Sequence, residues 1–365
     1  MWTILITLCI VCAVAALAKR IWPKDISKVE ILMLVTVSVL LTTGIYFAGA
    51  YAQTADAEVW NGNVTGKHPA KTSCSHSYSC NCRTVYRPPT CSGGKSYSCS
   101  GGGSTTICDT CYKHSYDVNW VIESNIGSWN VDRVDSQGLQ EPQRFTIVKQ
   151  GDPVSSTRSY TNYIKGAPDS LFHAYAGIAQ QYQNVIPEYP LAIYDMYKLN
   201  HAVVIGNVPV PEIDKWNYEL AMMNGRLGPS KQVNILVVFT NVSNQKFLYA
   251  LESAWLGGKK NDVIVVIGTS KYPTIDWVGV TSWTDKQLFK VQLRDEIFSQ
   301  KQIDRTQLLA AIERTVLSSY NRKPMADFEY LKYEIEPPTW VFILSIVLGS
   351  VCAVALAFVF RDKEL

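Results

Sequence analysis

The sequence predicts an α/β fold, a small mixed sheet covered by helices, that lies outside a membrane. It also predicts a cysteine-rich, disulfide-stapled insertion in that domain and three transmembrane helices. Three observations lead to this prediction: three long apolar runs, seven cysteines gathered in one short polar stretch, and alternating strand and helix patterns before the last apolar run.

The three apolar runs occupy residues 2–18, 29–51 and 339–360. The second and third hold 23 and 22 residues, enough to cross a hydrocarbon core of ~30 Å. The first has 17 uncharged residues and reaches ~25 Å as a helix. A cleaved signal peptide is the alternative for the first run, but it needs basic residues before the apolar region. Because Lys19 and Arg20 follow the run instead, we expect a retained helix.

The connector between the first two runs predicts the orientation. It holds four basic residues and one acidic residue: Lys19, Arg20, Lys24, Lys28 and Asp25. Short basic loops stay in the cytoplasm, so we expect an integral membrane protein with three spans, its N-terminus outside and its C-terminus cytoplasmic. The main domain is then extracytoplasmic, either periplasmic or extracellular.

The outer domain concentrates its cysteines in 38 residues, between positions 74 and 111. The disulfide candidates are Cys74, Cys80, Cys82, Cys91, Cys99, Cys108 and Cys111. A Gly- and Ser-rich stretch in an oxidising compartment favours disulfides over free thiols. Seven is an odd number, so at most three bridges form within one chain, and the remaining thiol is free or links two subunits.

Zinc is the alternative explanation for this cluster. Its candidate ligands are Cys80, Cys82, Cys108, Cys111, His76 and His114. Zinc ribbons usually contain two Cys-x-x-Cys pairs, and here only one is present. We therefore expect disulfides and assign no metal and no cofactor.

Patterning along the chain predicts five segments. They are an N-terminal transmembrane hairpin at 1–51, a cysteine-rich module at 52–115, a Tyr-rich mixed β/α segment at 116–200, an α/β domain at 201–325, and a juxtamembrane segment with the C-terminal transmembrane helix at 326–365. The module begins with a polar lead-in at 52–72 and continues as a knob rich in turn signals. In the Tyr-rich segment we expect strands at 116–122 and 144–149 and a helix near 169–184. Its tyrosines either pack internally or form a partner surface.

The α/β domain has the clearest secondary-structure pattern. Expected strands lie at 203–205, 233–240, 262–268 and 275–281, and expected helices at 211–226, 244–256, 285–299 and 304–320. The runs 233–240 and 262–268 are almost wholly apolar, as strands buried on both faces are.

The run Trp255-Leu-Gly-Gly-Lys-Lys-Asn-Asp-Val-Ile-Val-Val-Ile-Gly268, with the order of elements around it, resembles the TPM domain. The resemblance covers roughly residues 200–322, and the sequence lacks the glycine that typically precedes the valine of that family's motif. The family includes membrane-anchored extracytoplasmic proteins and photosystem II repair factors. Some members are phosphatases with a metal held by acidic residues, and this resemblance implies Asp262 alone. Asp276 and Asp285 are candidate neighbours because they lie near the ends of expected strands. Other members bind neighbouring membrane complexes.

No P-loop, Gly-x-Ser-x-Gly or His-Glu-x-x-His motif occurs in the sequence, so we assign no catalytic residues. The charge balance of 34 basic against 31 acidic residues, without a basic block, excludes nucleic acid as a partner. We expect a structural or interaction protein of the lipid bilayer, a scaffold that acts through protein–protein contacts of its outer domain. Its partner would be a second copy, forming a homo-oligomer, or another membrane protein. The alternative is a metal-dependent, phosphatase-like hydrolase.

Overall fold

The structure, a computed structural model, describes residues 2–88, 90–93, 97–100, 102–167, 176–190 and 200–362, with only the backbone for 2–4, 90–93, 97–100 and 176. The chain forms two compact units. Unit 1 comprises Met1–Asn61 and Ser155–Leu365, and unit 2 comprises Gly62–Val154. Strand β1 (Ala55–Thr72) runs from the first unit into the second.

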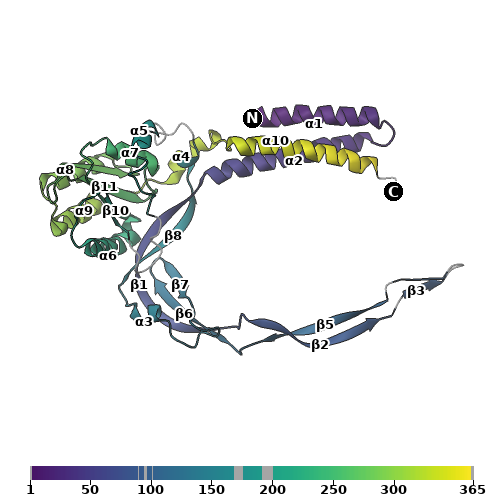
Figure 1. Cartoon of the computed structure of the whole chain (residues 1–365), viewed down its shortest axis with the longest axis horizontal. Coiled ribbons are helices and arrows are strands. Elements are labelled where there is room, and N and C mark those ends of the chain that lie inside the picture. The colour runs from purple at the N-terminus through teal and green to yellow at the C-terminus, as the bar shows by residue number, and fades with distance from the viewer. Residues whose placement is uncertain are drawn as a thin grey trace. The chain divides into compact units, whose positions relative to one another are not determined.

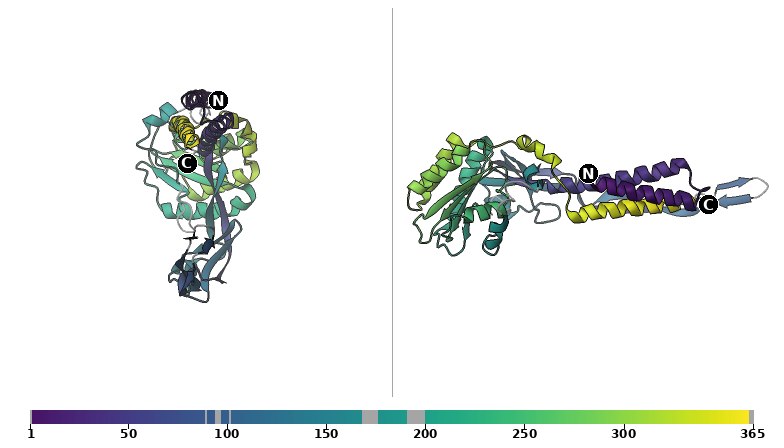
Figure 2. Two further views of the ribbon diagram at one scale, coloured as in Figure 1. Left: turned by 90° about the vertical axis from the view of Figure 1, so that its right-hand side faces the viewer. Right: turned by 90° about the horizontal axis from the view of Figure 1, so that it is seen from above.

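Three long helices of unit 1 lie side by side: α1 (Trp2–Ile21), α2 (Lys28–Gln53) and α10 (Thr339–Arg361) (Figures 1 and 2). Length and composition qualify two of them, α2 and α10, to cross a membrane, whereas the sequence predicts three. The difference concerns α1, in which Trp2 to Ala18 are uncharged and Lys19 and Arg20 follow.

Helices α2 and α10 bury one residue per turn, at every third or fourth position, and several of these residues are small. The buried residues are Leu34, Ser38, Thr42, Tyr46 and Ala50 on α2, and Val341, Ser345, Gly349, Ala353, Ala357 and Phe360 on α10. A Cβ atom on Gly349 would overlap the Thr42 hydroxyl, and that hydroxyl donates hydrogen bonds to the carbonyls of Ser38 (2.9 Å) and Ser345 (3.4 Å). Such close approach through small residues is typical of helices that associate in lipid.

The α/β part of unit 1 contains one four-stranded sheet with the order β12-β11-β10-β9. Its strands are β9 (Ala202–Ile205), β10 (Asn234–Thr240), β11 (Asp262–Gly268) and β12 (Trp277–Ser282). Strands β9, β10 and β11 are parallel, and β12 pairs antiparallel with β11. The four strands predicted here are confirmed, and so is the mixed α/β class.

Helices cover the two faces of this sheet. They are α6 (Ile213–Lys231), α7 (Phe247–Ala254), α8 (Gln287–Ser299) and α9 (Arg305–Ser319), close to the predicted ranges. Alternate strand residues point to opposite faces, so Ile235, Val237 and Phe239 join the core under α6, α8 and α9. Leu236 and Val238 join the core under α7. This arrangement explains why the strands are apolar at every position.

Strands β6 (Asp117–Ser124) and β7 (Gly127–Val131) belong to unit 2, whereas β1 and β8 (Pro153–Thr161) continue between the two units. These strands form one sheet in the order β7-β6-β1-β8. The predicted polar lead-in at 52–72 is therefore largely an 18-residue strand. Its polar and apolar side chains alternate too irregularly for a period of two to be recognised in the sequence.

The strand predicted at 144–149 is wrong, because this segment forms the short helix α3 (Gln143–Ile147). Pro142 precedes the helix, and proline is well suited to a helix start. Phe145 is buried and packs edge-on against Trp120, with ring centroids 4.8 Å apart. A single helical turn thus buries the one aromatic side chain of this segment.

The remaining described elements of unit 1 are short: α4 (Tyr163–Gly166), α5 (Ala176–Gln181) and the 3-10 helix η2 (Met325–Tyr333). The helix predicted at 169–184 lies partly outside the described residues, and α5 occupies its second half. Of the tyrosines there, Tyr182 packs on Phe247 and Tyr189 on Trp255, with ring centroids 5.4 and 5.5 Å apart. Tyr175, Tyr194 and Tyr197 lie outside the described residues.

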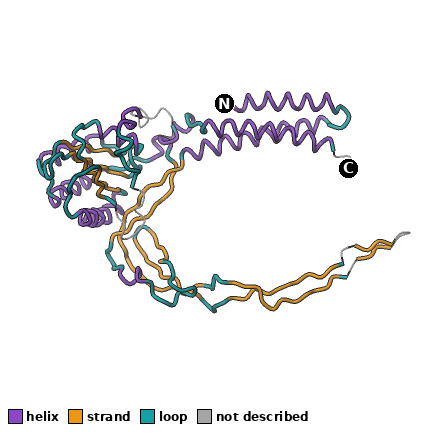
Figure 3. Tube along the Cα trace, viewed as in Figure 1, coloured by secondary structure: helices purple, strands orange, loops and turns teal. Residues whose placement is uncertain are grey.

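The cysteine-rich insertion is an extended double hairpin (Figure 3). Strands β2 (Ser77–Arg87) and β5 (Gly103–Tyr112) pair antiparallel, and β3 (Thr90–Gly93) pairs with β4 (Tyr97–Ser100). Most described side chains of β2 and β5 are exposed on both faces. The predicted knob is therefore an arm without a core, which we call the β2–β5 arm.

Two disulfides join the strands of this arm, Cys80–Cys111 and Cys82–Cys108. Cys108 and Cys111 are three residues apart and point to opposite faces of β5. The two cysteines of β2 are only two residues apart, and a bulge at Asn81, with φ at 48°, restores the match by adding one residue to β2. Four of the predicted disulfide cysteines are thus confirmed as paired.

Candidate metal centre

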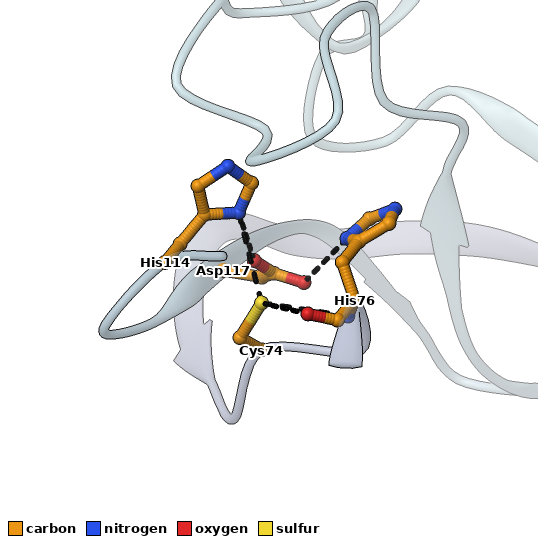
Figure 4. Close-up of side chains that lie close together, drawn as sticks. All are labelled: Cys74, His76, His114 and Asp117. Atoms are coloured by element: carbon orange, nitrogen blue, oxygen red, sulfur yellow. Dashed lines mark hydrogen bonds and ion pairs between the residues drawn. The ribbon is translucent and has the colours of Figure 1, made fainter. Parts of the chain in front are cut away.

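Four side chains that can bind a metal meet where the β2–β5 arm joins its sheet (Figure 4). Cys74 and His76 lie in the segment that leads from β1 into β2. His114 lies in the segment that leads from β5 into β6, and Asp117 is the first residue of β6. The cluster therefore joins the two chain segments that connect the arm to the sheet, and all four residues belong to unit 2.

The ligand atoms of these four side chains lie within 4.8 Å of one another. The Cys74 Sγ is 3.6 Å from the His114 Nδ1, and that nitrogen is 3.2 Å from Oδ1 of Asp117. The His76 Nδ1 lies 3.8 Å from Oδ2 of the same carboxylate. Cys74 is a free, buried thiol and Asp117 is fully buried, whereas the side chains of His76 and His114 are 38% and 20% exposed, so solvent reaches the cluster from the histidine side.

Asp117 is held in place by further hydrogen bonds to its Oδ2 atom. The backbone N–H of Ser75 donates to it over 3.0 Å, and Nη1 of Arg133 over 2.8 Å. The hydrogen bond from the Ser75 N–H, the largest cause, and the one from Arg133 hold the pKa of Asp117 well below its usual range. Burial acts in the opposite direction but does not cancel their effect. The carboxylate is therefore ionised, with Oδ1 beside His114 and Oδ2 nearer to His76.

The cluster differs from the zinc set considered from the sequence. His76 and His114 belong to both, but the four cysteines of that set are used in disulfides. Cys74 and Asp117 take their place, and neither was predicted as a ligand. The sequence contains two signals for such a site, the spacings Cys74-x-His76 and His114-x-x-Asp117. They predict one site only if two segments 40 residues apart are assumed to meet. The side chains of the remaining disulfide candidates, Cys91 and Cys99, lie outside those described, although the backbone register places the two residues opposite each other.

Asp262, the principal acidic residue of the hydrolase hypothesis, is fully buried at the start of β11. Its carboxylate accepts hydrogen bonds from the Tyr189 hydroxyl (2.7 Å), the Asn234 side chain (2.8 Å) and the Lys259 backbone N–H (2.7 Å). Burial, the largest cause, raises the pKa of Asp262 to about 6 despite these bonds. The partners account for both oxygen atoms, as in a structural buried carboxylate.

The other two acidic residues lie apart from Asp262 in the sheet. Asp276 precedes β12 and accepts a hydrogen bond from the Ser270 backbone, beside the carboxyl end of β11. Asp262 is at the opposite end of β11, about 20 Å away at the usual rise per residue. Asp285 forms an ion pair with Lys323 at 3.6 Å. The structure does not gather these three carboxylates into one site, and this geometry does not favour the hydrolase hypothesis.

A second charged cluster ties β1 to the α/β part of unit 1. Glu58, buried on β1, accepts two hydrogen bonds from Nη2 of Arg322 and lies 3.9 Å from the Lys260 ammonium. Asp56, also on β1, pairs with Lys259. Burial alone would raise the pKa of Asp56, but the hydrogen bonds from Lys259 and Asn162 bring this pKa below its ordinary value. These pairs fix the start of β1, just after α2, against the loop that leads into β11 and against the segment that follows α9.

Comparisons with known proteins identify no relative. No protein-family model, no curated protein and no solved structure matches the chain. The resemblance to the TPM domain stays a prediction, and the function has to be argued from the structure itself.

Proposed function

We propose that the chain is a three-span membrane protein whose outer part acts through protein–protein contacts, in a homo-oligomer or with another membrane protein. The observation that carries the proposal is the β2–β5 arm: a two-stranded ribbon, exposed on both faces, that two disulfides hold in shape. An isolated two-stranded hairpin is marginally stable in water. Covalent stabilisation of a structure that encloses no core suits an element that serves as a contact surface.

The arm presents aromatic side chains to solvent. Tyr78, Tyr86 and Tyr112 are between 51% and 68% exposed. The strand register places Tyr86 and Tyr112 on one face, opposite the face that carries Ile107. Exposed aromatic residues on a rigid support are typical of binding surfaces, because tyrosine supplies contact area at a low entropy cost.

Helices α1, α2 and α10 support a location in the membrane. Helices α2 and α10 meet the length and composition of spans, and α1 packs against them while leaving Leu5, Leu17 and Ile21 more than half exposed. Lipid would cover these side chains if α1 crosses as well. The disulfides of the arm favour an oxidising compartment, which agrees with a cytoplasmic connector between α1 and α2.

Cross-linking of the full chain in membranes tests the contact role. We expect native mass spectrometry to show an oligomer, or cross-linking to recover a membrane partner. The double substitution Tyr86→Ser and Tyr112→Ser should weaken the complex while unfolding stability changes by less than about 0.5 kcal/mol. Tyr218→Ser, at an exposed tyrosine of α6, is the matched control. A monomer without any cross-linked partner would refute the proposal.

Protease treatment of intact cells that express the chain tests the orientation. The outer part carries Arg83 in the arm and Lys113 next to it, and the connector carries Lys24 and Lys28, so trypsin has targets in both. We expect cleavage within the outer part and protection of the connector, as read from the fragments by mass spectrometry. Cleavage in the connector with an intact outer part would show the reverse orientation.

A further inference from the structure

We infer that Cys74, His76, His114 and Asp117 bind a structural Zn²⁺ ion that fixes the hinge of the β2–β5 arm. The ion would connect the segment between β1 and β2 with the segment between β5 and β6. This inference does not depend on the proposed contact role, because it concerns the internal structure of unit 2.

The spacing of the ligand atoms fits a tetrahedral zinc site. Zinc bonds of ~2.0–2.1 Å to nitrogen or oxygen and ~2.3 Å to sulfur imply edges of about 3.3–3.6 Å between neighbouring ligand atoms. The observed separations are 3.6 Å between Cys74 Sγ and His114 Nδ1, and 3.2 Å between His114 Nδ1 and Asp117 Oδ1. No ligand atom lies more than 4.8 Å from another, so small side-chain rotations bring all four to bonding distance.

The donor set selects the metal. One thiol and two imidazoles suit zinc, whereas Mg²⁺ and Ca²⁺ prefer oxygen ligands alone. Four protein ligands without a position left for water are typical of structural sites rather than catalytic ones. Ser75 and Arg133 donate hydrogen bonds to the other oxygen of Asp117 and would hold the carboxylate in the orientation that the metal needs.

A metal also accounts for the unpaired cysteine. The disulfides link Cys80 with Cys111 and Cys82 with Cys108, all within the arm. Among the described residues no disulfide closes the hinge itself, where Cys74 lies as a free thiol. Zinc coordination would hold the hinge and would keep this thiol from oxidation in an oxidising compartment.

Metal analysis of the purified full-length protein tests the inference. We expect about one zinc per chain, the content of one tetrahedral site. Cys74→Ser and His114→Asn should lower this content to near zero, and Arg133→Gln should weaken zinc affinity by about 10- to 100-fold. His68→Asn, an exposed histidine of the same unit whose only described charged partner is Glu123, is the control and should leave zinc content unchanged. Equal zinc content in all variants, or copper instead of zinc, would overturn the assignment.

Two measurements on the wild-type protein keep the test independent of how the variants fold. After zinc is replaced by cobalt, a thiolate-to-cobalt charge-transfer band is expected, and its absence would exclude Cys74 as a ligand. A chelator should also increase alkylation of Cys74 and proteolysis at Lys113 in the hinge. If neither changes, the cluster is a hydrogen-bonded network around Asp117, and the zinc site is refuted.

Discussion

The strand pairs β10–β11 and β2–β5 differ in how they are stabilised. Every residue of β10 and β11 is buried, and helices cover the sheet on both faces. Nearly every described side chain of β2 and β5 is exposed, and disulfides join the strands. The first pair is stabilised by burial of apolar surface. The second is stabilised mainly by its disulfides, which lower the conformational entropy of the unfolded chain. One chain thus combines a cooperative core with an arm that can be altered at its surface at little cost in stability.

Loss of a core side chain is the strongest way to test this difference. Phe239 is fully buried and packs against Trp216, with ring centroids 5.0 Å apart. Phe239→Ala should lower the free energy of unfolding by about 3–5 kcal/mol, as measured by denaturant titration in detergent. Tyr86→Ala removes a ring of similar size from the arm and should cost less than about 0.5 kcal/mol. Comparable losses would mean that the arm also depends on a packed interior.

A buried charge should matter almost as much as a buried ring. Glu58→Gln leaves Arg322 and Lys260 without their carboxylate in a largely buried site, which should cost about 3–5 kcal/mol. The control is Glu313→Gln, which breaks a partly exposed ion pair with Arg226 and should cost about 1 kcal/mol or less. If the two substitutions have similar effects on the free energy of unfolding, water reaches Glu58 in the folded protein and screens its ion pairs.

Removal of a disulfide should affect the arm alone. The Cys82–Cys108 bridge closes a segment with a sequence separation of 26, which corresponds to about 3.5 kcal/mol of chain entropy. The double substitution Cys82→Ser and Cys108→Ser should speed hydrogen exchange in β2 and β5 while β10 and β11 stay protected. Cys352→Ser, at a free cysteine of α10, should change neither region. Faster exchange in β10 would show that the two units unfold together.

The same difference determines how well the sequence predicts each region. The α/β elements follow from apolar periodicity, because runs such as 233–240 are long and their helices end at recognisable signals. The arm has no such periodicity, and the pairing of its cysteines depends on a bulge at Asn81 that no composition rule indicates. The metal cluster needs two loops to meet, and it is the antiparallel pairings of β1 with β6 and of β2 with β5 that bring Cys74 close to His114.

Two buried groups of the α/β part should give opposite pH effects. Burial lowers the pKa of His201 to about 4. Nδ1 of the ring lies 3.1 Å from the side-chain amide of Asn224. The unfolded chain binds a proton near pH 6.5 and the folded protein does not, so this group lowers stability as the pH falls. From pH 7 to 5 the loss is about 2 kcal/mol.

Asp262 works in the other direction, because its folded pKa of about 6 lies above the ordinary value of 3.8. The folded protein binds a proton first, so acidification from pH 7 to 5 adds about 1 kcal/mol of stability. The wild type should therefore lose only about 1 kcal/mol from the two groups together. In denaturant titrations His201→Leu should become relatively more stable at pH 5 than the wild type, and Asp262→Asn relatively less stable. Equal pH dependence in all three proteins would mean that neither buried group changes its protonation on unfolding, and that the core of the α/β part is as insensitive to acid as the disulfide-linked arm.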